Sequence, residues 1–171
     1  MGTPTTVMGE VRPESDCPDD ASLVRLIYRR SFALPASEIW AALTEPRELS
    51  RWYGTYTGDP STGWVRLTMV DEHDSATVDV RIVECTPPAR FSVDVDGWLL
   101  AVALHTVGRV TTLDFTHSHV PRSEAGEIGP GWQYYLDRLD AALTGGRPPQ
   151  WTDYLSLVDR YRSDASLPAD Q

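Results

Sequence analysis

Hydrophobic and polar side chains alternate with a period of two in several segments of this chain, and each such segment predicts a β-strand with one buried face. The first strand spans residues 22–32. Later strands are expected at 64–70, 76–84, 91–96, 98–107 and 109–119, with turns at Pro87, Pro88, Gly97 and Gly108. Because short turns join consecutive strands, the pattern indicates an antiparallel meander and a sheet of about six strands.

Elsewhere apolar residues recur every three to four positions, which predicts helices. Residues 34–46 form a short helix that ends at Pro46, and residues 46–53 form a second. After a polar loop at 120–129, residues 129–146 predict a long amphipathic helix, with one stripe made of Trp132, Tyr135, Leu136, Leu139 and Leu143. A last short helix at 150–162 places Trp151, Leu155 and Val158 on one face.

The chain divides into three parts. Residues 1–20 have no apolar period, so we expect a flexible lead-in. Residues 21–146 hold the strong periodic signals and are expected to fold as one α+β domain. Residues 147–171 form an extension whose aromatic residues either cover an exposed edge of the body or fold over the mouth of a binding site as a gate.

Composition and charge narrow the possible partners. Hydrophobic residues at 41% and charged residues at 23% are typical of a globular protein. The 15 basic and 25 acidic residues give a net charge of −10, so neither nucleic acid nor a membrane is expected as a partner. Every basic residue is arginine, which excludes Schiff-base chemistry and lysine-dependent phosphate loops. We recognise no signal peptide or membrane span and expect a cytoplasmic protein.

Three stretches resemble a known family. They are RSFALPASEIWAALTEPRELSRWYG (30–54), TTLDFTHSH (111–119) and GPGWQYYLDRLDAALTG (129–145), in which a Gly-Trp pair opens the long helix. Their order and spacing are similar to the helix-grip superfamily, called START-like or SRPBCC, and within it to the activator-of-heat-shock-ATPase homologues. The resemblance covers residues 22–145 and departs from the simplest family pattern at both ends of the chain.

This resemblance implies a curved antiparallel sheet wrapped around the long C-terminal helix. A curved sheet cannot press its whole concave face onto one helical stripe, so we expect a cavity between them. The superfamily includes lipid carriers, hormone receptors, polyketide cyclases and co-chaperones, so the fold does not define the function.

The histidines are the first candidates for polar chemistry. His117 and His119 are two apart in the last strand and are therefore expected on one face. Because His117 shares its parity with Leu113 and Phe115, we expect it to point inward. It would there be a general base or a hydrogen-bond partner of a ligand, or it would close a hydrogen-bond network at the strand end.

Small and aromatic side chains are the candidates for the cavity wall. Ala101 and Ala103, in register with His105, either leave room for a cavity or allow close approach of a neighbouring element. The six tryptophans and seven tyrosines either line a site for a planar apolar ligand or fill the core. The predicted ligand-binding residues are Trp52, Trp64, Leu67, Met69, Val80, Ala101, Ala103, His105, Phe115, His117, Tyr135 and Leu139.

Other chemistries lack support. A zinc site needs three converging ligands, and a His-x-His pair in a strand supplies two, so no metal is expected. There is no Gly-x-Ser-x-Gly motif, and Asp79, Asp94 and Asp96 share the solvent-facing parity of their strands. No catalytic residue and no cofactor is therefore assigned. Cys17 and Cys85 form no paired framework.

Three functions remain, and the sequence favours the first. It is a cytoplasmic carrier or sensor for a small, mainly hydrophobic molecule, of which a lipid is one example. The second is a co-chaperone-like role, with a contact patch for a chaperone partner. The third resembles the polyketide cyclases and aromatases, with His117 or Tyr135 moving a proton. The oligomeric state stays open.

Overall fold

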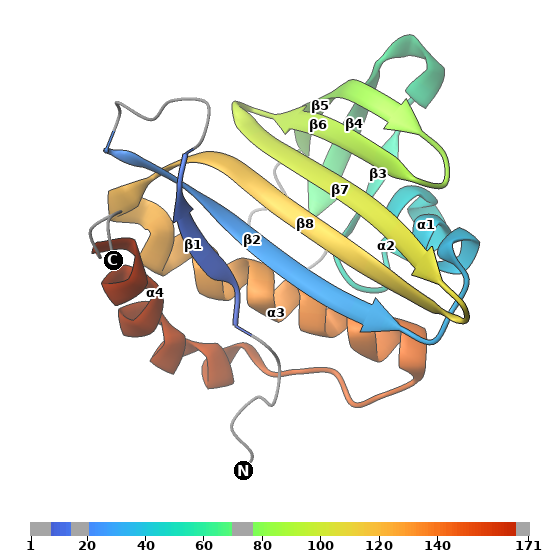
Figure 1. Cartoon of the computed structure of the whole chain (residues 1–171). Coiled ribbons are helices and arrows are strands. Elements are labelled where there is room, and N and C mark those ends of the chain that lie inside the picture. Colours follow the sequence, from blue (N-terminus) through green and yellow to red (C-terminus); the bar gives the residue numbers. More distant parts are fainter. Residues whose placement is uncertain (1–7, 15–20, 70–76, 167–171) are drawn as a thin grey trace.

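A computed structural model describes residues 8–14, 21–69 and 77–166. Among these residues, eight strands form one antiparallel sheet in the order β1-β2-β8-β7-β6-β5-β4-β3. The long helix α3 lies against one face of this sheet, and α1 and α2 lie near its β3 end (Figure 1). The α+β helix-grip architecture expected from the sequence is confirmed.

The element bounds follow the predicted pattern closely. The strands are β1 (Glu10–Pro13), β2 (Leu23–Phe32), β3 (Gly54–Thr57), β4 (Trp64–Met69), β5 (Thr77–Thr86), β6 (Arg90–Val95), β7 (Trp98–Val107) and β8 (Val110–Pro121). The α-helices are α1 (Ala36–Thr44), α2 (Pro46–Leu49), α3 (Ala125–Thr144) and α4 (Val158–Ser166), and the 3₁₀ turns are η1 (Pro60–Thr62), η2 (Arg122–Glu124) and η3 (Trp151–Leu157).

Two short strands, β1 and β3, were not expected. β1 pairs with β2, with Glu10 opposite Ile27, so the prediction of a flexible lead-in is wrong for residues 10–13. Contacts distant in sequence hold β1, because the backbone N–H of Gly9 donates to the Tyr161 hydroxyl at 2.9 Å. A four-residue strand stabilised in this way has too little pattern of its own to be recognised. Residues 1–7 and 15–20 of the lead-in, with Cys17, and the predicted strand ends at 70 and 76 lie outside the described residues.

The core lies between the sheet and α3. Leu26 and Tyr28 of β2 and Leu113 of β8 are at most 1% exposed, and they face the buried stripe of α3. On that stripe Leu136 and Leu139 are equally well buried. Burying an apolar side chain of this size stabilises a fold by about 1.5–3 kcal/mol, so this layer holds the helix on the sheet.

The long helix begins at Ala125 rather than at residue 129, and Pro130 lies inside it. Contacts with α4 accompany this first turn of the helix. Gly126 and Gly129 have no side chains, so α4 packs directly against the backbone of α3 at these two positions. A Cβ atom on Gly129 would lie 2.3 Å from the Tyr161 ring. The Gly-Pro-Gly sequence that suggested a helix start therefore reflects the close approach of another helix.

The C-terminal extension packs along α3 and reaches β1 (Figure 1). Its buried residues are Tyr154, Tyr161 and Ala165, whereas Trp151 and Leu155, which were expected on the buried face, are 42% and 54% exposed. The 3₁₀ geometry of η3 rotates the expected stripe away from the body. None of the described residues of the extension lines the cavity, so the gate interpretation is wrong.

Candidate functional site

A cavity of about 370 Å³ lies between the concave face of the sheet and the helices α1, α2 and α3. Its buried wall combines aliphatic side chains from the strands with residues from all three helices. These buried lining residues are Leu43, Leu49, Trp52, Leu67, Val80, Leu100, Val102, Leu113, Phe115, Trp132 and Leu136.

Aromatic rings form the inner end of the cavity. Trp132 on α3 packs against Phe115 on β8, with ring centroids 4.5 Å apart. Tyr53 stacks on Trp132 at 5.8 Å, and Trp52 lies 5.3 Å from Tyr53. The indole N–H of Trp52 donates to the carbonyl of Ala42 at 2.8 Å, which fixes this ring on α1. The inner end is therefore a wall of rings held in place by packing and by hydrogen bonds of the Trp52 and Trp132 indoles.

The opposite end is the mouth, which we define by the exposed lining residues Pro60, Cys85 and Pro87. Phe91 pairs with Cys85 across strands β5 and β6, and Trp40 meets the Phe91 ring edge-on at 5.5 Å.

The lining side chains are uncharged. Among the described residues, no Asp, Glu, Arg or His lines the cavity. The polar atoms of the wall are the hydroxyls of Thr44, Tyr53 and Tyr56 and the thiol of Cys85. The Tyr56 hydroxyl already donates to the carbonyl of Thr44. Because a charged group buried here would find no counter-charge, the interior suits a neutral apolar molecule.

Cys85 reaches the wall through a bulge in β5. Val80 and Ile82 point into the cavity, and the register then shifts between Ile82 and Glu84, which leaves Val83 exposed. One extra residue reverses the alternation, so Cys85 points inward. Cys85 was not predicted as a lining residue because unbroken alternation was assumed for this strand, although the alternation fails at the run Val-Glu-Cys. Tyr56, which follows α2 without a periodic pattern, was not predicted either.

Four of the predicted site residues line the cavity: Trp52, Leu67, Val80 and Phe115. Three others pack just outside it. Tyr135 meets the Tyr53 ring at 5.0 Å, Leu139 is fully buried in the core, and Met69 is half-buried against that core. These three support the wall from behind and are absent from its lining.

The interpretation that Ala101, Ala103 and His105 face the cavity is wrong. Leu100, Val102 and Leu104 fill the inner face of β7, and the alternate residues lie on the outer face. Both faces of this strand are largely apolar in sequence, and the bulkier set is the one buried. His105 instead lies 3.4 Å from the Asp114 carboxylate.

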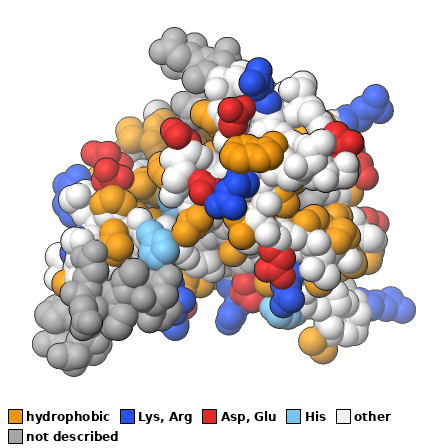
Figure 2. Space-filling view, turned by 90° about the horizontal axis from the view of Figure 1, so that it is seen from above, with side chains coloured by type: hydrophobic (Ala, Val, Ile, Leu, Met, Phe, Trp, Pro, Cys, Tyr) orange, Lys and Arg blue, Asp and Glu red, His pale blue; other side chains and the backbone are white. Residues whose placement is uncertain are grey.

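Trp64 is likewise on the outside, 52% exposed. It shares its parity with Arg66, whose guanidinium pairs with Asp79 at 3.3 Å. The sequence therefore contained the correct signal for this residue. Figure 2 shows acidic and basic side chains interspersed with hydrophobic ones over one face of the molecule.

His117 is buried, 1% exposed, but is not among the residues that line the cavity. Its Nδ1 accepts the indole N–H of Trp132 at 3.0 Å, and the Trp98 ring lies 4.6 Å from its ring. Burial lowers the pKa of His117 to about 4, so the ring is neutral at pH 7. His117 therefore holds the ring of Trp132, which lines the cavity, and does not line the cavity itself.

His119 does not share a face with His117, contrary to the prediction. Val120 pairs with Val24 and His117 pairs with Leu26, so Ser118 and His119 together oppose a single residue of β2. This bulge puts His119 at a positive φ of 58° and breaks the alternation.

Membrane and metal signals are absent from the part of the chain that the structure describes. No helix there is long and apolar enough to cross a bilayer. No group of three or more His, Cys, Asp or Glu residues there is arranged to hold a metal ion.

Fold and cavity together define a helix-grip protein with an uncharged interior pocket. The model of the family described as "Activator of Hsp90 ATPase homolog 1-like protein" matches residues 33–144, and the chain belongs to this family. No curated protein matches the chain.

Solved structures share the fold over most of the chain. CalU16 from Micromonospora echinospora is 22% identical with a TM-score of 0.71, over 85% of this chain and 90% of its own. A conserved protein of unknown function from Enterococcus faecalis is 16% identical with a TM-score of 0.72, over 93% of this chain and 92% of its own. DynU16, from the dynemicin biosynthetic locus, is 26% identical with a TM-score of 0.61, over 72% of this chain and 48% of its own.

Proposed function

We propose that this protein binds a small, mainly hydrophobic molecule in the cavity between the sheet and α3. The observation that carries the proposal is a cavity of about 370 Å³ whose described lining includes no charged side chain. That volume lies within the range of small-molecule pockets. The uncharged wall combines aliphatic and aromatic side chains, so the free energy falls when an apolar ring system replaces water inside it.

A neutral fluorescent probe, N-phenyl-1-naphthylamine, tests this proposal. Cys85 lines the cavity and is a free thiol, so a bound probe should slow its reaction with Ellman's reagent in a Cys17→Ser background. We expect saturable probe fluorescence and a rate of Cys85 labelling that falls at least fivefold at saturation.

Matched variants locate the probe. Val93→Phe puts extra volume into the cavity, and we expect it to weaken probe binding at least fivefold, whereas Val83→Phe, on the exposed bulge of β5, should change binding less than twofold. Equal affinity in both variants, or no protection of Cys85, would show that the cavity is not the binding site.

Family membership favours a second candidate, a protein-interaction role like that of the heat-shock ATPase activators after which the family is named. Adding the purified protein to such an ATPase and measuring ATP turnover tests it; unchanged turnover excludes it. The enzymatic alternative gains no support, because neither His117 nor Tyr135 is among the described residues that line the cavity.

A further inference from the structure

We propose that the cavity prefers cationic amphiphiles: an apolar ring body that fills the interior and carries one protonated amine, which lies at the mouth. This inference rests on the proposed function and names the class of ligand. Three features of the mouth carry it: its carboxylates, the pairing of its cation and its aromatic rings.

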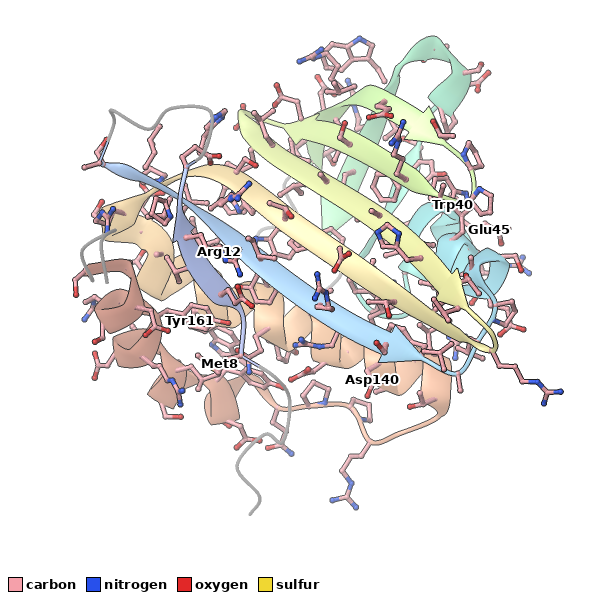
Figure 3. All side chains as sticks on the ribbon, viewed as in Figure 1. Met8, Arg12, Trp40, Glu45, Asp140 and Tyr161 are labelled. Carbon is pink, nitrogen blue, oxygen red and sulfur yellow. The ribbon has the colours of Figure 1, made fainter. Side chains whose placement is uncertain are left out.

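Two carboxylates flank the mouth without a cationic partner. Glu45 directly follows the lining residue Thr44, and it lies beside Trp40 at the end of α1 (Figure 3). Asp59 directly precedes the lining residue Pro60. Among the described residues, no Arg or His makes an ion pair with either carboxylate.

Both carboxylates interact with groups at the entrance of the cavity. Burial raises the pKa of Tyr56, and the charge of Glu45 raises it further, so the field of Glu45 reaches the cavity wall. The backbone N–H of Ser61 donates to Asp59 at 2.9 Å and lowers the pKa of that carboxyl, which keeps it ionised.

One cation adjacent to the mouth is already paired. Arg90 precedes the lining residue Phe91, and its guanidinium lies 2.7 Å from the Glu84 carboxylate. The charge presented to an entering molecule is therefore negative, in agreement with the net charge of −10 of the whole chain. An anionic ligand would meet repulsion at this point, and a cation would be attracted.

Aromatic rings supply the second attraction. Trp40 and Phe91 meet at 5.5 Å, and Tyr56 lines the same end of the cavity. Aromatic rings attract ammonium groups through the negative potential of their faces. Because the interior offers no counter-charge, the ammonium would stay among these rings and carboxylates while the apolar body enters.

Three pyrene derivatives with the same ring system test the proposal: 1-pyrenemethylamine, 1-pyrenemethanol and 1-pyrenecarboxylate. At pH 7 and low salt we expect the amine to bind about three- to fivefold more tightly than the alcohol, and the carboxylate to bind most weakly. The double variant Glu45→Gln with Asp59→Asn should reduce the advantage of the amine to less than twofold, the part that the aromatic rings supply, without changing the affinity for the alcohol. Glu48→Gln is the matched control, because Glu48 is paired with Arg51 at 3.1 Å, and it should keep the order.

The outcomes separate this inference from the proposed function. If the alcohol binds and protects Cys85 but the amine has no advantage, or keeps its advantage in the double variant, the charge preference is wrong and cavity binding stands. If none of the three binds, the proposed function fails and this inference fails with it.

Discussion

The indole N–H of Trp132 donates to His117 Nδ1 at 3.0 Å, and this bond fixes a ring of the cavity wall. Both side chains are buried, so losing the acceptor would leave an unsatisfied donor in an apolar environment. His117 is thus a positioning residue in this structure. Its inward direction was predictable from parity, but its partner was not, because Trp132 lies 15 residues away on another element.

Replacing His117 by residues with and without an acceptor tests that hydrogen bond. His117→Leu should lower the free energy of unfolding by about 1–3 kcal/mol, because the indole N–H loses its acceptor. His117→Gln keeps an acceptor oxygen and should lose less. Urea denaturation measures both, and equal losses would show that packing rather than the hydrogen bond matters at this position.

The low pKa of His117 also predicts a pH dependence of stability. The folded-state pKa is about 4, below the unfolded value of 6.5, so the unfolded state binds more protons between these two values. The free energy of unfolding should therefore fall as the pH drops from 6.5 through 4, by at most about 3 kcal/mol from this residue. The difference between wild type and His117→Gln isolates the effect from carboxylate titration; a difference independent of pH would contradict it.

At the scale of the element, alternation predicted where strands lie but not always which face is buried. In β8, Leu113, Phe115 and His117 were correctly predicted to point inward, up to the bulge. β7 is apolar on both faces, so the volume of the side chains determined which face is buried. The prediction therefore failed for Ala101 and Ala103, which are smaller than the residues of the buried face. The bulges in β5 and β8 reversed the parity of Cys85 and His119, because one inserted residue has no signature in a period-two pattern.

The long helix provides a matched pair of glycines for a second test. Gly129→Ala should lower the free energy of unfolding by about 1–3 kcal/mol, because the new methyl group would lie 2.3 Å from the Tyr161 ring. Gly131 has no atom within 4 Å of the corresponding position, so Gly131→Ala should raise stability by about 0.5–1 kcal/mol through helix propensity. Thermal or urea unfolding measures the stability of both variants. Equal stability would show that Gly129 is not needed for the close approach of Tyr161.

At the scale of the whole molecule, the cavity and the C-terminal extension lie at different ends of the fold. The extension buries a polar network: Tyr154 donates to Asp137 at 2.5 Å, and Arg30 lies 3.4 Å from the same carboxylate. An extension that covers part of the body was one of the two expectations from the sequence, but this polar network was not predicted, because buried polar partners leave no periodic signal.

Tyr154→Phe tests whether that network acts independently of the cavity. Removing the hydroxyl takes a donor from a buried carboxylate, so the free energy of unfolding should fall by about 1–3 kcal/mol. Binding of N-phenyl-1-naphthylamine should stay within twofold of wild type. Tyr134→Phe, whose hydroxyl meets only the guanidinium of Arg138 at 3.4 Å, is the milder control. Weakened probe binding by Tyr154→Phe in a fully folded protein would show that the two regions are coupled.

The hydrogen bond from Gly9 to Tyr161 ties together two residues that are 152 positions apart. Because Gly9 directly precedes β1 and Tyr161 lies in α4, the bond makes these two elements stabilise each other. If α4 were displaced, the buried N–H of Gly9 would lose its acceptor, so loosening one element weakens the attachment of the other.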